Sequence, residues 1–443
     1  MGFSVMSRYW DEELETAPRE VLKRKQLDDL KEIVRFAYDR APYYKRSFDA
    51  AGVRPSDIHS LKDIEGVPFI NKKTQRDSQG VGSFLGELAA VPEEDVIFGS
   101  TSSGSTGVPT MSPFTRKDFD EWQDVESRLL WMAGLRKNDR YIHALNFSLY
   151  VGGPDVIGAQ NLGALCIWGG TLPSERLIFI LREYKPTAIW TSPSYAWYLG
   201  DTARKTGVDP KRDFGIKRIF AAGEMGGSIA ATRQSIEELW GAHLYDIYGL
   251  SDIFGACAAM CEHHDGLHIA EDHILVETVD LDTGEVLLPG ERGELVYTTL
   301  RKHARPLIRF RTGDIGRFVT DRCACGRTLG RIHVDGRKDD MFIVSAVNVY
   351  PSDIEFVVRG LDGVTGEYLI RITEEDFTAH YEVTIEKSHD NPEADTPVAE
   401  RVATALKARI GVKPRRVIVL PDGSIERSTH KAKRIIDERN KQQ

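Results

Sequence analysis

A stretch rich in hydroxyl and glycine residues is the part of the sequence best suited to chemistry. Residues 101–110 read TSSGSTGVPT, and the first seven are Ser, Thr or Gly. Small residues let backbone N–H groups approach phosphate oxygens, and hydroxyls add further donors. Because the stretch follows the strand-like run VIFGS, we predict a phosphate-binding loop rather than a flexible surface loop. It is not a Walker A loop, since no Gly-Lys-Ser/Thr follows. In this phosphate loop, the predicted ligands are Ser102, Ser103, Gly104, Ser105, Thr106 and Gly107.

Cysteine and histidine residues in the second half of the chain suggest a metal site. Cys323 and Cys325 flank one residue, and Cys261 lies in a stretch with three histidines, the last of which is His268. Zinc takes four nitrogen or sulfur ligands in a tetrahedron, so three cysteines and one histidine suffice. Four protein ligands leave no open position, which makes such a zinc structural rather than catalytic. The alternative is buried thiols beside solvated histidines.

The elements that must position these residues are those of an α/β protein. From about residue 90 to residue 250, short apolar runs alternate with helical stretches. This alternation is typical of a sheet with parallel portions, whose ligands bind at the carboxyl ends of the strands. The predicted strands lie in DRYIHAL, ALCIWGG, PTAIWTS and IKRIFAAG.

The regions on either side have a different character. Residues 18–40 carry apolar side chains at helical spacing and predict an amphipathic helix. Residues 274–318 predict a β-rich module with a hairpin around the Asp-Thr-Gly turn at 282–284.

A compact unit is predicted after Arg337. Alternating apolar residues at 368–372 and 381–385 predict two strands. Thr396, with the proline after it, is predicted to begin a helix that Gly411 ends.

Composition narrows the class of protein. The chain has 443 residues, which suggests two or three domains, and a formal net charge of -9. That charge argues against a nucleic-acid or anionic-membrane partner, since both need a basic surface. No apolar run is long enough for a transmembrane helix, and the start lacks an apolar signal core. We therefore expect a cytoplasmic protein, in which five cysteines are thiols or metal ligands before they are disulfides.

Five motifs in order along the chain resemble those of the adenylate-forming superfamily, which includes acyl-CoA synthetases, luciferases and peptide-synthetase adenylation domains. The first is the phosphate loop. The others are YGLSD at 248–252, FRTGDIG at 310–316, GRKDDMFIVSAVNVYPSDIE at 336–355 and RSTHKAKR at 427–434. Further segments, among them RAPYYKRSFDAAGV, GLHIAEDHILVE and CACGRT, are similar to phenylacetate–CoA ligases. The resemblance covers nearly the whole chain.

The resemblance implies a domain organisation. It gives a large N-terminal domain of mixed sheets and helices, residues 1–337, that includes the β-rich module and the zinc site at about 255–337. A small mobile α+β C-terminal domain, residues 338–443, carries the catalytic lysine and turns at the hinge residue Asp339. The oligomeric state stays open between a monomer and a homodimer.

The resemblance also implies which residues bind the nucleotide. Asp314 would accept hydrogen bonds from the ribose hydroxyls, although a turn aspartate often caps its own backbone. Tyr248 offers a flat ring for adenine, and a half-buried structural aromatic is the alternative. Besides the phosphate loop, the implied ATP-binding residues are Ala222, Gly223, Glu224, Asp246, Ile247, Tyr248, Gly249, Ser251, Asp314 and Arg337.

Three residues are implied to be catalytic: Thr106, Asp252 and Lys431. Asp252 stands where the family has a magnesium-binding glutamate, so its carboxylate is withdrawn by one methylene. Lys431 would sit as a point charge between the acid's carboxylate and the α-phosphate. The family usually has glycine before this lysine and this chain has His430, which leaves Lys433 as an alternative.

For the metal site, relatives with this cysteine pair take their histidine from a Gly-Leu-His segment. The implied ligands of a structural Zn2+ are therefore Cys261, His268, Cys323 and Cys325, with Cys257 as the main rival.

The implied reaction has two halves. An aromatic carboxylic acid attacks Mg2+-bound ATP to give acyl-AMP and pyrophosphate, and coenzyme A then displaces AMP. The acid pocket is predicted around Phe147, Tyr150, Gly153 and Tyr248, because a flat ring needs apolar walls. Benzoates and arylacetates fit equally well. Two alternatives remain: an enzyme that loads a carrier protein or makes an amide, and a non-catalytic nucleotide- or metal-binding regulator.

Overall fold

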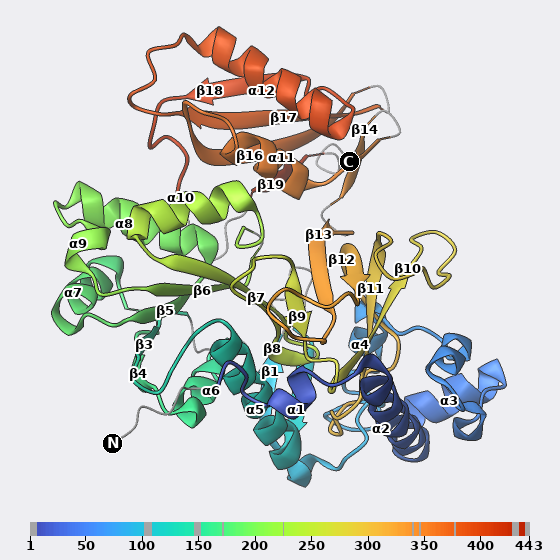
Figure 1. The fold of residues 1–443 in the computed structure, drawn as a ribbon. Helices are drawn as coiled ribbons and strands as arrows, with labels where there is room; N and C mark the ends of the chain where they lie inside the picture. The colour runs from blue at the N-terminus through green and yellow to red at the C-terminus, as the bar shows by residue number, and fades with distance from the viewer. Residues whose placement is uncertain are drawn as a thin grey trace, which may run out of the picture. The chain divides into compact units, whose positions relative to one another are not determined.

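The computed structural model describes residues 7–101, 109–145, 152–170, 172–224, 226–338, 341–344, 347–375, 378–427 and 434–438 (Figure 1). The chain forms two compact units. The first comprises Met1–Thr191, Lys211–Gly223 and Ala242–Val334. The second comprises Ser192–Pro210, Glu224–Gly241 and Asp335–Gln443.

An eleven-stranded sheet organises the first unit, in the order β10-β11-β12-β13-β9-β8-β7-β6-β5-β3-β4. Strands β4, β3, β5, β6 and β7 run parallel, which confirms the α/β prediction. From β7 through β8 to β9 the pairing is antiparallel. The strands are β3 Arg140–His143, β4 Leu165–Trp168, β5 Ala188–Thr191, β6 Arg218–Ala222, β7 His243–Leu250, β8 Phe254–Met260, β9 Leu267–Ile269, β10 Ile274–Val279, β11 Gly293–Thr299, β12 Phe310–Val319 and β13 Arg331–Arg337.

The β-rich module contains the predicted hairpin in a short form. Val279 bridges Val286 across the Asp-Thr-Gly turn, and the N–H groups of Asp280 and Leu287 bond to the carbonyls of Glu285 and Thr278 at 2.8 Å each. In the turn, Asp280 Oδ1 accepts hydrogen bonds from the backbone N–H groups of Asp282 and Thr283 at 3.0 and 2.8 Å. The long antiparallel partner of β10 is β11.

Helices cover this sheet. Helix α5 packs on α6 and β8, as Figure 1 shows. Trp122, Val125 and Leu129 of α5 are fully buried. Helix α2 confirms the helix predicted at 18–40, with Leu30 and Val34 in the core and Pro18 as its N-cap. The helices of this unit are α1 Glu12–Glu15, α2 Arg19–Arg40, α3 Pro42–Ala51, α4 Lys72–Ser78, α5 Arg116–Met132, α6 Asp155–Leu162 and α7 Ser174–Tyr184.

A separate two-stranded hairpin carries the phosphate loop. Strand β1, Val96–Thr101, includes the predicted VIFGS strand and pairs antiparallel with β2, Met111–Thr115. Thr101 and Met111 are register partners, so the loop leaves and re-enters the hairpin at one end. Phe98 and Phe114 of the hairpin pack their rings against Trp122 of α5.

The second unit contains a four-stranded sheet, in the order β18-β17-β16-β19. The two strands predicted from alternating residues are β16 and β17, with Ile370 opposite Val383. Helix α12 begins at Asp395 with Ala394 as its N-cap, two residues before the predicted proline, and Gly411 ends it at φ 93°. The elements are α8 Pro193–Lys205, α10 Ala230–Trp240, β14 Phe342–Val344, β15 Val347–Val349, α11 Pro351–Arg359, β16 Val364–Glu375, β17 Thr378–Lys387, α12 Asp395–Ile410, β18 Arg416–Leu420 and β19 Ile435–Asp437, with α9, Pro210–Asp213, at the junction of the units.

Among the described residues, no helix combines the length and apolar character needed to cross a bilayer.

Candidate active site

Two predicted nucleotide-binding residues meet in the first unit. Tyr248 of β7 donates its hydroxyl hydrogen to Asp314 Oδ2 of β12 at 2.6 Å. The Asp314 backbone N–H bonds to Thr312 Oγ1 at 2.9 Å, and Gly313 between them takes φ 78°, a conformation that glycine adopts readily. Burial, together with the charge of Asp314, raises the pKa of the Tyr248 phenol well above its usual value. Tyr248 therefore stays a neutral donor that orients the carboxylate.

The carboxyl ends of β6 and β7 hold most of the other predicted nucleotide residues. Ala222 pairs with Ile247 across these parallel strands, and Gly223 follows with open space where a side chain would be. This is the edge of a parallel sheet at which ligands bind. Asp246, Tyr248 and Gly249 lie on β7, and Ser251 follows it.

Two predicted nucleotide residues belong to the second unit. Glu224 Oε1 accepts a hydrogen bond from the Ser194 backbone N–H at 2.7 Å, and Arg337 ends β13.

Asp252 lies next to the ends of the hairpin that carries the phosphate loop. The Oγ of Ser112, in β2, donates to the Asp252 carbonyl at 3.1 Å, and the Oγ of Ser100, in β1, donates to the Ser251 carbonyl at 3.3 Å. The Asp252 carboxylate is contacted by Lys72 Nζ at 2.5 and 2.7 Å. Lys72 was missed from the sequence, where nothing distinguishes it from the neighbouring Lys73.

A fully buried lysine, Lys302, bonds both the hairpin and the segment that carries Asp252. Lys302 Nζ donates to Ser112 Oγ at 2.5 Å and to the carbonyls of Asp252 and Ile253 at 2.9 and 2.8 Å. Its ammonium also lies 4.0 Å from the centre of the Phe114 ring. Burial, reinforced by the positive charge of Arg305, lowers the pKa of Lys302 well below its usual value. Lys302 thus joins the phosphate-loop hairpin to the segment that carries Asp252, and sequence reasoning missed it.

The four predicted metal ligands come together. The ligand atoms of Cys261, His268, Cys323 and Cys325 all lie within 4.8 Å of one another, and all four residues are buried. The Sγ atoms of Cys261 and Cys323 are 3.8 Å apart, which is about the separation expected for two sulfurs 2.3 Å from one tetrahedral zinc. His268 Nδ1 lies 3.0 Å from the Leu329 carbonyl, which leaves Nε2 directed to the cysteines.

The thiols of this cluster are unequal. The hydrogen bond from Cys261 and the neighbouring His268 lower the pKa of Cys325, whereas the same hydrogen bond and burial raise the pKa of Cys261. The rival ligand Cys257 is not part of the group of four.

A pair of buried acids lies beside the predicted acid-binding stretch, and no motif in the sequence indicates it. Gly153 opens the turn into α6, where Val156 N–H bonds to its carbonyl at 3.3 Å. Two residues later, Asp155 meets Glu126 of α5, and both are almost fully buried. Burial raises the pKa of each carboxyl, and their mutual repulsion raises that of Glu126 further. Two adjoining buried carboxylates cannot both stay ionised, so the pair holds a proton.

Several predicted residues lie outside the described part of the chain. They are Ser102, Ser103, Gly104, Ser105, Thr106 and Gly107 of the phosphate loop, Phe147 and Tyr150 of the acid pocket, the hinge residue Asp339, and Lys431 with its alternative Lys433.

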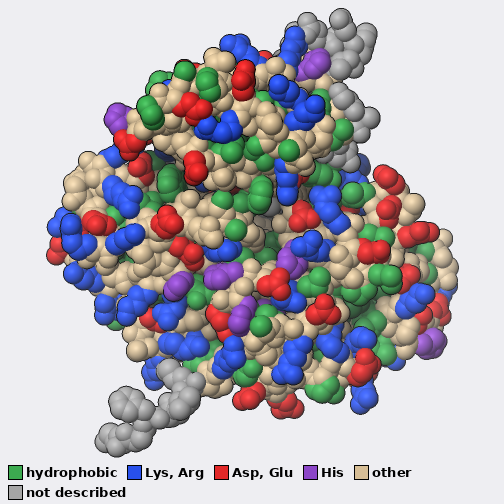
Figure 2. All heavy atoms as spheres, turned by 45° about the horizontal axis from the view of Figure 1, so that its top comes forward, with side chains coloured by type: hydrophobic (Ala, Val, Ile, Leu, Met, Phe, Trp, Pro, Cys, Tyr) green, Lys and Arg blue, Asp and Glu red, His purple; other side chains and the backbone are tan. Residues whose placement is uncertain are grey.

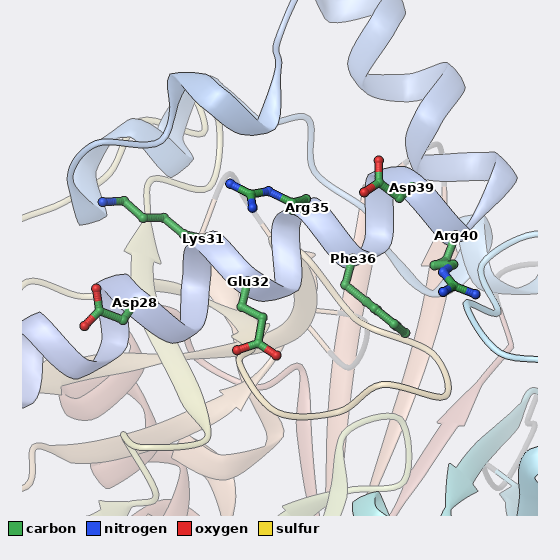
Figure 3. Close-up of a pocket in the computed structure, with 7 residues that line it drawn as sticks. All are labelled: Asp28, Lys31, Glu32, Arg35, Phe36, Asp39 and Arg40. Carbon is green, nitrogen blue, oxygen red and sulfur yellow. The ribbon is translucent and has the colours of Figure 1, made fainter.

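A surface hollow of about 460 Å³ runs along α2 (Figure 3). Its walls alternate in charge, and its one aromatic residue, Phe36, packs edge-on against His303. None of its lining residues belongs to the sequence motifs. On the face drawn in Figure 2, acidic and basic side chains are likewise interspersed over the described residues. The lining residues are Asp28, Lys31, Glu32, Arg35, Phe36, Asp39 and Arg40.

Several known proteins are similar to this chain in sequence and in fold. Residues 21–299 match the AMP-binding enzyme family, and residues 346–439 match the AMP-binding enzyme C-terminal domain. The phenylacetate–coenzyme A ligase of Thermus thermophilus is 36% identical over 96% of this chain and 98% of its own length. That of Escherichia coli is 34% identical over 96% of this chain and 97% of its own length.

Solved structures agree with the sequence relatives. A 2-hydroxyisobutyryl-CoA ligase in complex with 2-HIB-AMP superposes with a TM-score of 0.92 at 31% identity, covering 99% of this chain and 94% of that one. The match at both levels confirms the resemblance inferred from the five motifs. The chain belongs to the AMP-binding enzyme family, within the group that contains the phenylacetate–coenzyme A ligases.

Proposed function

We propose that the protein is an ATP-dependent ligase that joins an aromatic carboxylic acid to coenzyme A through an acyl-AMP intermediate. The observation that carries this proposal is the likeness to four phenylacetate–coenzyme A ligases, at 34–36% identity over 96–97% of the chain. The hydrogen bond between Tyr248 and Asp314, two residues of separate nucleotide-binding motifs, supports it.

In this proposal the nucleotide is held mainly by position and charge. Asp314 accepts hydrogen bonds from the ribose hydroxyls, with its orientation set by Tyr248. The phosphate loop, with Thr106, holds the phosphates, and Lys431 brings the acid's carboxylate to the α-phosphate. A magnesium ion on the phosphates would neutralise charge as the P–O bond forms, with Asp252 as its candidate protein ligand.

The second half of the reaction requires a different arrangement of groups. The thiol of coenzyme A attacks the acyl carbon, the bond to AMP breaks, and the thioester forms. We propose that residues 338–443 turn about Asp339 between the two steps, and that residues 1–337 hold the acyl-AMP throughout.

The acid is the least defined part of the proposal. Phe147, Tyr150, Gly153 and Tyr248 would form flat apolar walls for an aromatic ring. The sequence alone left benzoates and arylacetates as equal candidates. The names of the relatives favour an arylacetate.

A substrate panel tests the proposal. Benzoates, phenylacetates and aliphatic acids are first screened for acid-dependent ATP–pyrophosphate exchange, and then for thioester formation with free coenzyme A. We expect at least one aromatic acid to support both reactions. Exchange without thioester would indicate a carrier-protein or amide-forming enzyme, and no exchange with any acid would overturn the proposal.

We also propose a structural zinc held by Cys261, His268, Cys323 and Cys325. The support is the spacing and burial of the four ligand atoms. With four protein ligands its role would be to hold β8, β9 and the segment that carries the two later cysteines together.

A further inference from the structure

Asp252, the candidate magnesium ligand, is already paired with the ammonium group of a lysine. Both carboxylate oxygens of Asp252 are contacted by Lys72 Nζ, at 2.5 and 2.7 Å. A divalent cation would need at least one of these oxygens. The ammonium and the metal would therefore occupy the same position.

Of the two partners, Asp252 is buried and held by hydrogen bonds to its backbone, whereas the Lys72 side chain is partly exposed. The Asp252 side chain is 8% exposed, and its carbonyl is held by Ser112 Oγ and by the buried Lys302. The Lys72 side chain is 36% exposed and stands at the first position of a short surface helix. A lysine side chain has four carbons with free rotation, so the ammonium can leave without moving the backbone.

The helix that carries Lys72 also holds the far side of the phosphate loop. Asn71 caps the start of α4. At its other end Gln79 donates to the Pro109 carbonyl at 3.1 Å and accepts from the Met111 backbone N–H at 2.8 Å. The first residue of this short helix thus contacts Asp252, and the residue that caps its C-terminal end contacts the segment that follows the phosphate loop. Lys72 is held in the region where the phosphates and their metal would arrive.

We propose that Lys72 competes with the nucleotide's divalent cation for Asp252. The ammonium neutralises the buried carboxylate before nucleotide arrives, and the incoming metal displaces it. Lys72 is thus a positioning residue that keeps Asp252 from taking up metal in the absence of ATP. The proposal rests on the proposed function for the identity of the site. It makes a claim about metal binding that can be measured without nucleotide or acid.

Manganese binding to the nucleotide-free protein, followed by the electron paramagnetic resonance signal of free Mn2+, tests this directly. The protein is purified without chelator so that any zinc stays in place. We expect Lys72→Met to bind Mn2+ about two- to fivefold more tightly than the unmodified chain, the size expected for losing a partly exposed ion pair. Adding Asp252→Asn to Lys72→Met should abolish the gain in Mn2+ affinity. Asp252→Asn alone should show no gain. Lys72→Arg should keep the weak binding, since it keeps the charge.

Lys73 provides the matched control. It is the next residue of the same helix, and its ion pair with Asp77 is exposed. Lys73→Met should leave Mn2+ affinity unchanged. Equal Mn2+ affinity in Lys72→Met and the unmodified chain, or a gain that survives Asp252→Asn, would overturn the proposal. Failure of every acid in the exchange assay would count against the proposed function and leave this result standing.

Discussion

At the scale of single residues, the hydroxyl of Tyr248 has a role separate from that of its ring. The ring can lie against a base, whereas the hydroxyl holds Asp314 at 2.6 Å. Tyr248→Phe removes only the hydroxyl. We expect the KM for ATP in pyrophosphate exchange to rise about tenfold or more, because one hydrogen bond to a charged group contributes about 1.5 kcal/mol or more. The turnover number should change less.

The neighbouring Tyr297 is the control. Its ring packs edge-on against that of Tyr248, and its hydroxyl interacts with Tyr248 rather than forming the bond to Asp314. Tyr297→Phe should leave the KM for ATP unchanged. A loss of the same size in both variants would mean that packing, rather than the bond to Asp314, is at stake.

The buried acid pair predicts a pH dependence of stability. A carboxyl whose pKa is raised in the folded state stabilises the fold at low pH, and this contribution is lost as the pH rises through the raised pKa. The free energy of unfolding should therefore fall between pH 6 and pH 9. In Asp155→Asn the amide supplies a permanent N–H donor to Glu126, so we expect the fall to shrink by about 1 kcal/mol or more.

Urea unfolding at the two pH values measures this effect. Asp280→Asn is the control, because that exposed carboxylate has a lowered pKa and stays ionised throughout the range. It should not alter the pH dependence. An unchanged dependence in Asp155→Asn would show that the pair holds no proton.

Some residues of the candidate site could be predicted from sequence motifs, and others could be identified only from tertiary packing. Tyr248, Asp314 and the metal ligands belong to short motifs in which residue type and spacing carry the chemistry. Glu126 and Lys302 belong to no such motif, since each looks like a solvated charge until tertiary packing buries it. Glu126 sits in the polar run DEWQDVESR, and its partner lies 29 residues away on another helix.

At the scale of elements, the N-terminal segment is bonded to the segment that carries Cys323 and Cys325, two of the proposed zinc ligands. The Thr328 N–H bonds to the Glu15 carbonyl at 2.9 Å, and the Tyr9 hydroxyl bonds to the Cys325 carbonyl at 3.3 Å. A buried ion pair joins Arg327 to Glu15. Loss of metal should therefore loosen both segments together.

Cys323→Ser tests this coupling. We expect zinc content to drop from about one per chain, as four protein ligands imply, to near zero. Thermal stability should fall, and trypsin should cleave faster at Arg8 or Arg19. Cys257→Ser, a change at the buried cysteine outside the cluster, is the control and should keep its zinc. Metal-free protein of undiminished stability would contradict the structural zinc.

Secondary-structure elements were predicted correctly where a local sequence pattern alone determines them. The parallel strands β3, β4, β5 and β6 were found because each is a short apolar run between helical stretches. The longer pairing of β10 with β11 was not predicted, because strand pairing between segments distant in sequence leaves no local pattern. The start of α12 was misplaced by two residues because Asp395 extends the first turn before the proline.

At the scale of the whole molecule, the proposed nucleotide contacts come from groups far apart in the sequence, near residues 105, 314 and 431. Lys431 is predicted to act in the first half-reaction only. Lys431→Ala should slow acyl-AMP formation by at least about a hundredfold, the range for losing one charge-stabilising group. Thioester formation from preformed acyl-AMP should be little affected.

Single-turnover assays of each half-reaction make the comparison. Lys433→Ala, two residues along in the same motif, is the matched control and should be nearly unaffected in both. If Lys433→Ala instead shows the selective loss, the roles of the two lysines are exchanged. Equal loss of both half-reactions in Lys431→Ala would contradict the assignment.

Glycines at the centre of the first unit restrict how this enzyme can evolve. A methyl group on Gly249 would lie 1.8 Å from the Gly255 carbonyl oxygen, and one on Gly255 would lie 2.2 Å from Asp155 Oδ1. Neither position can accept even alanine without pushing backbone or a buried acid aside. A change of acid specificity must therefore come from positions other than these two glycines.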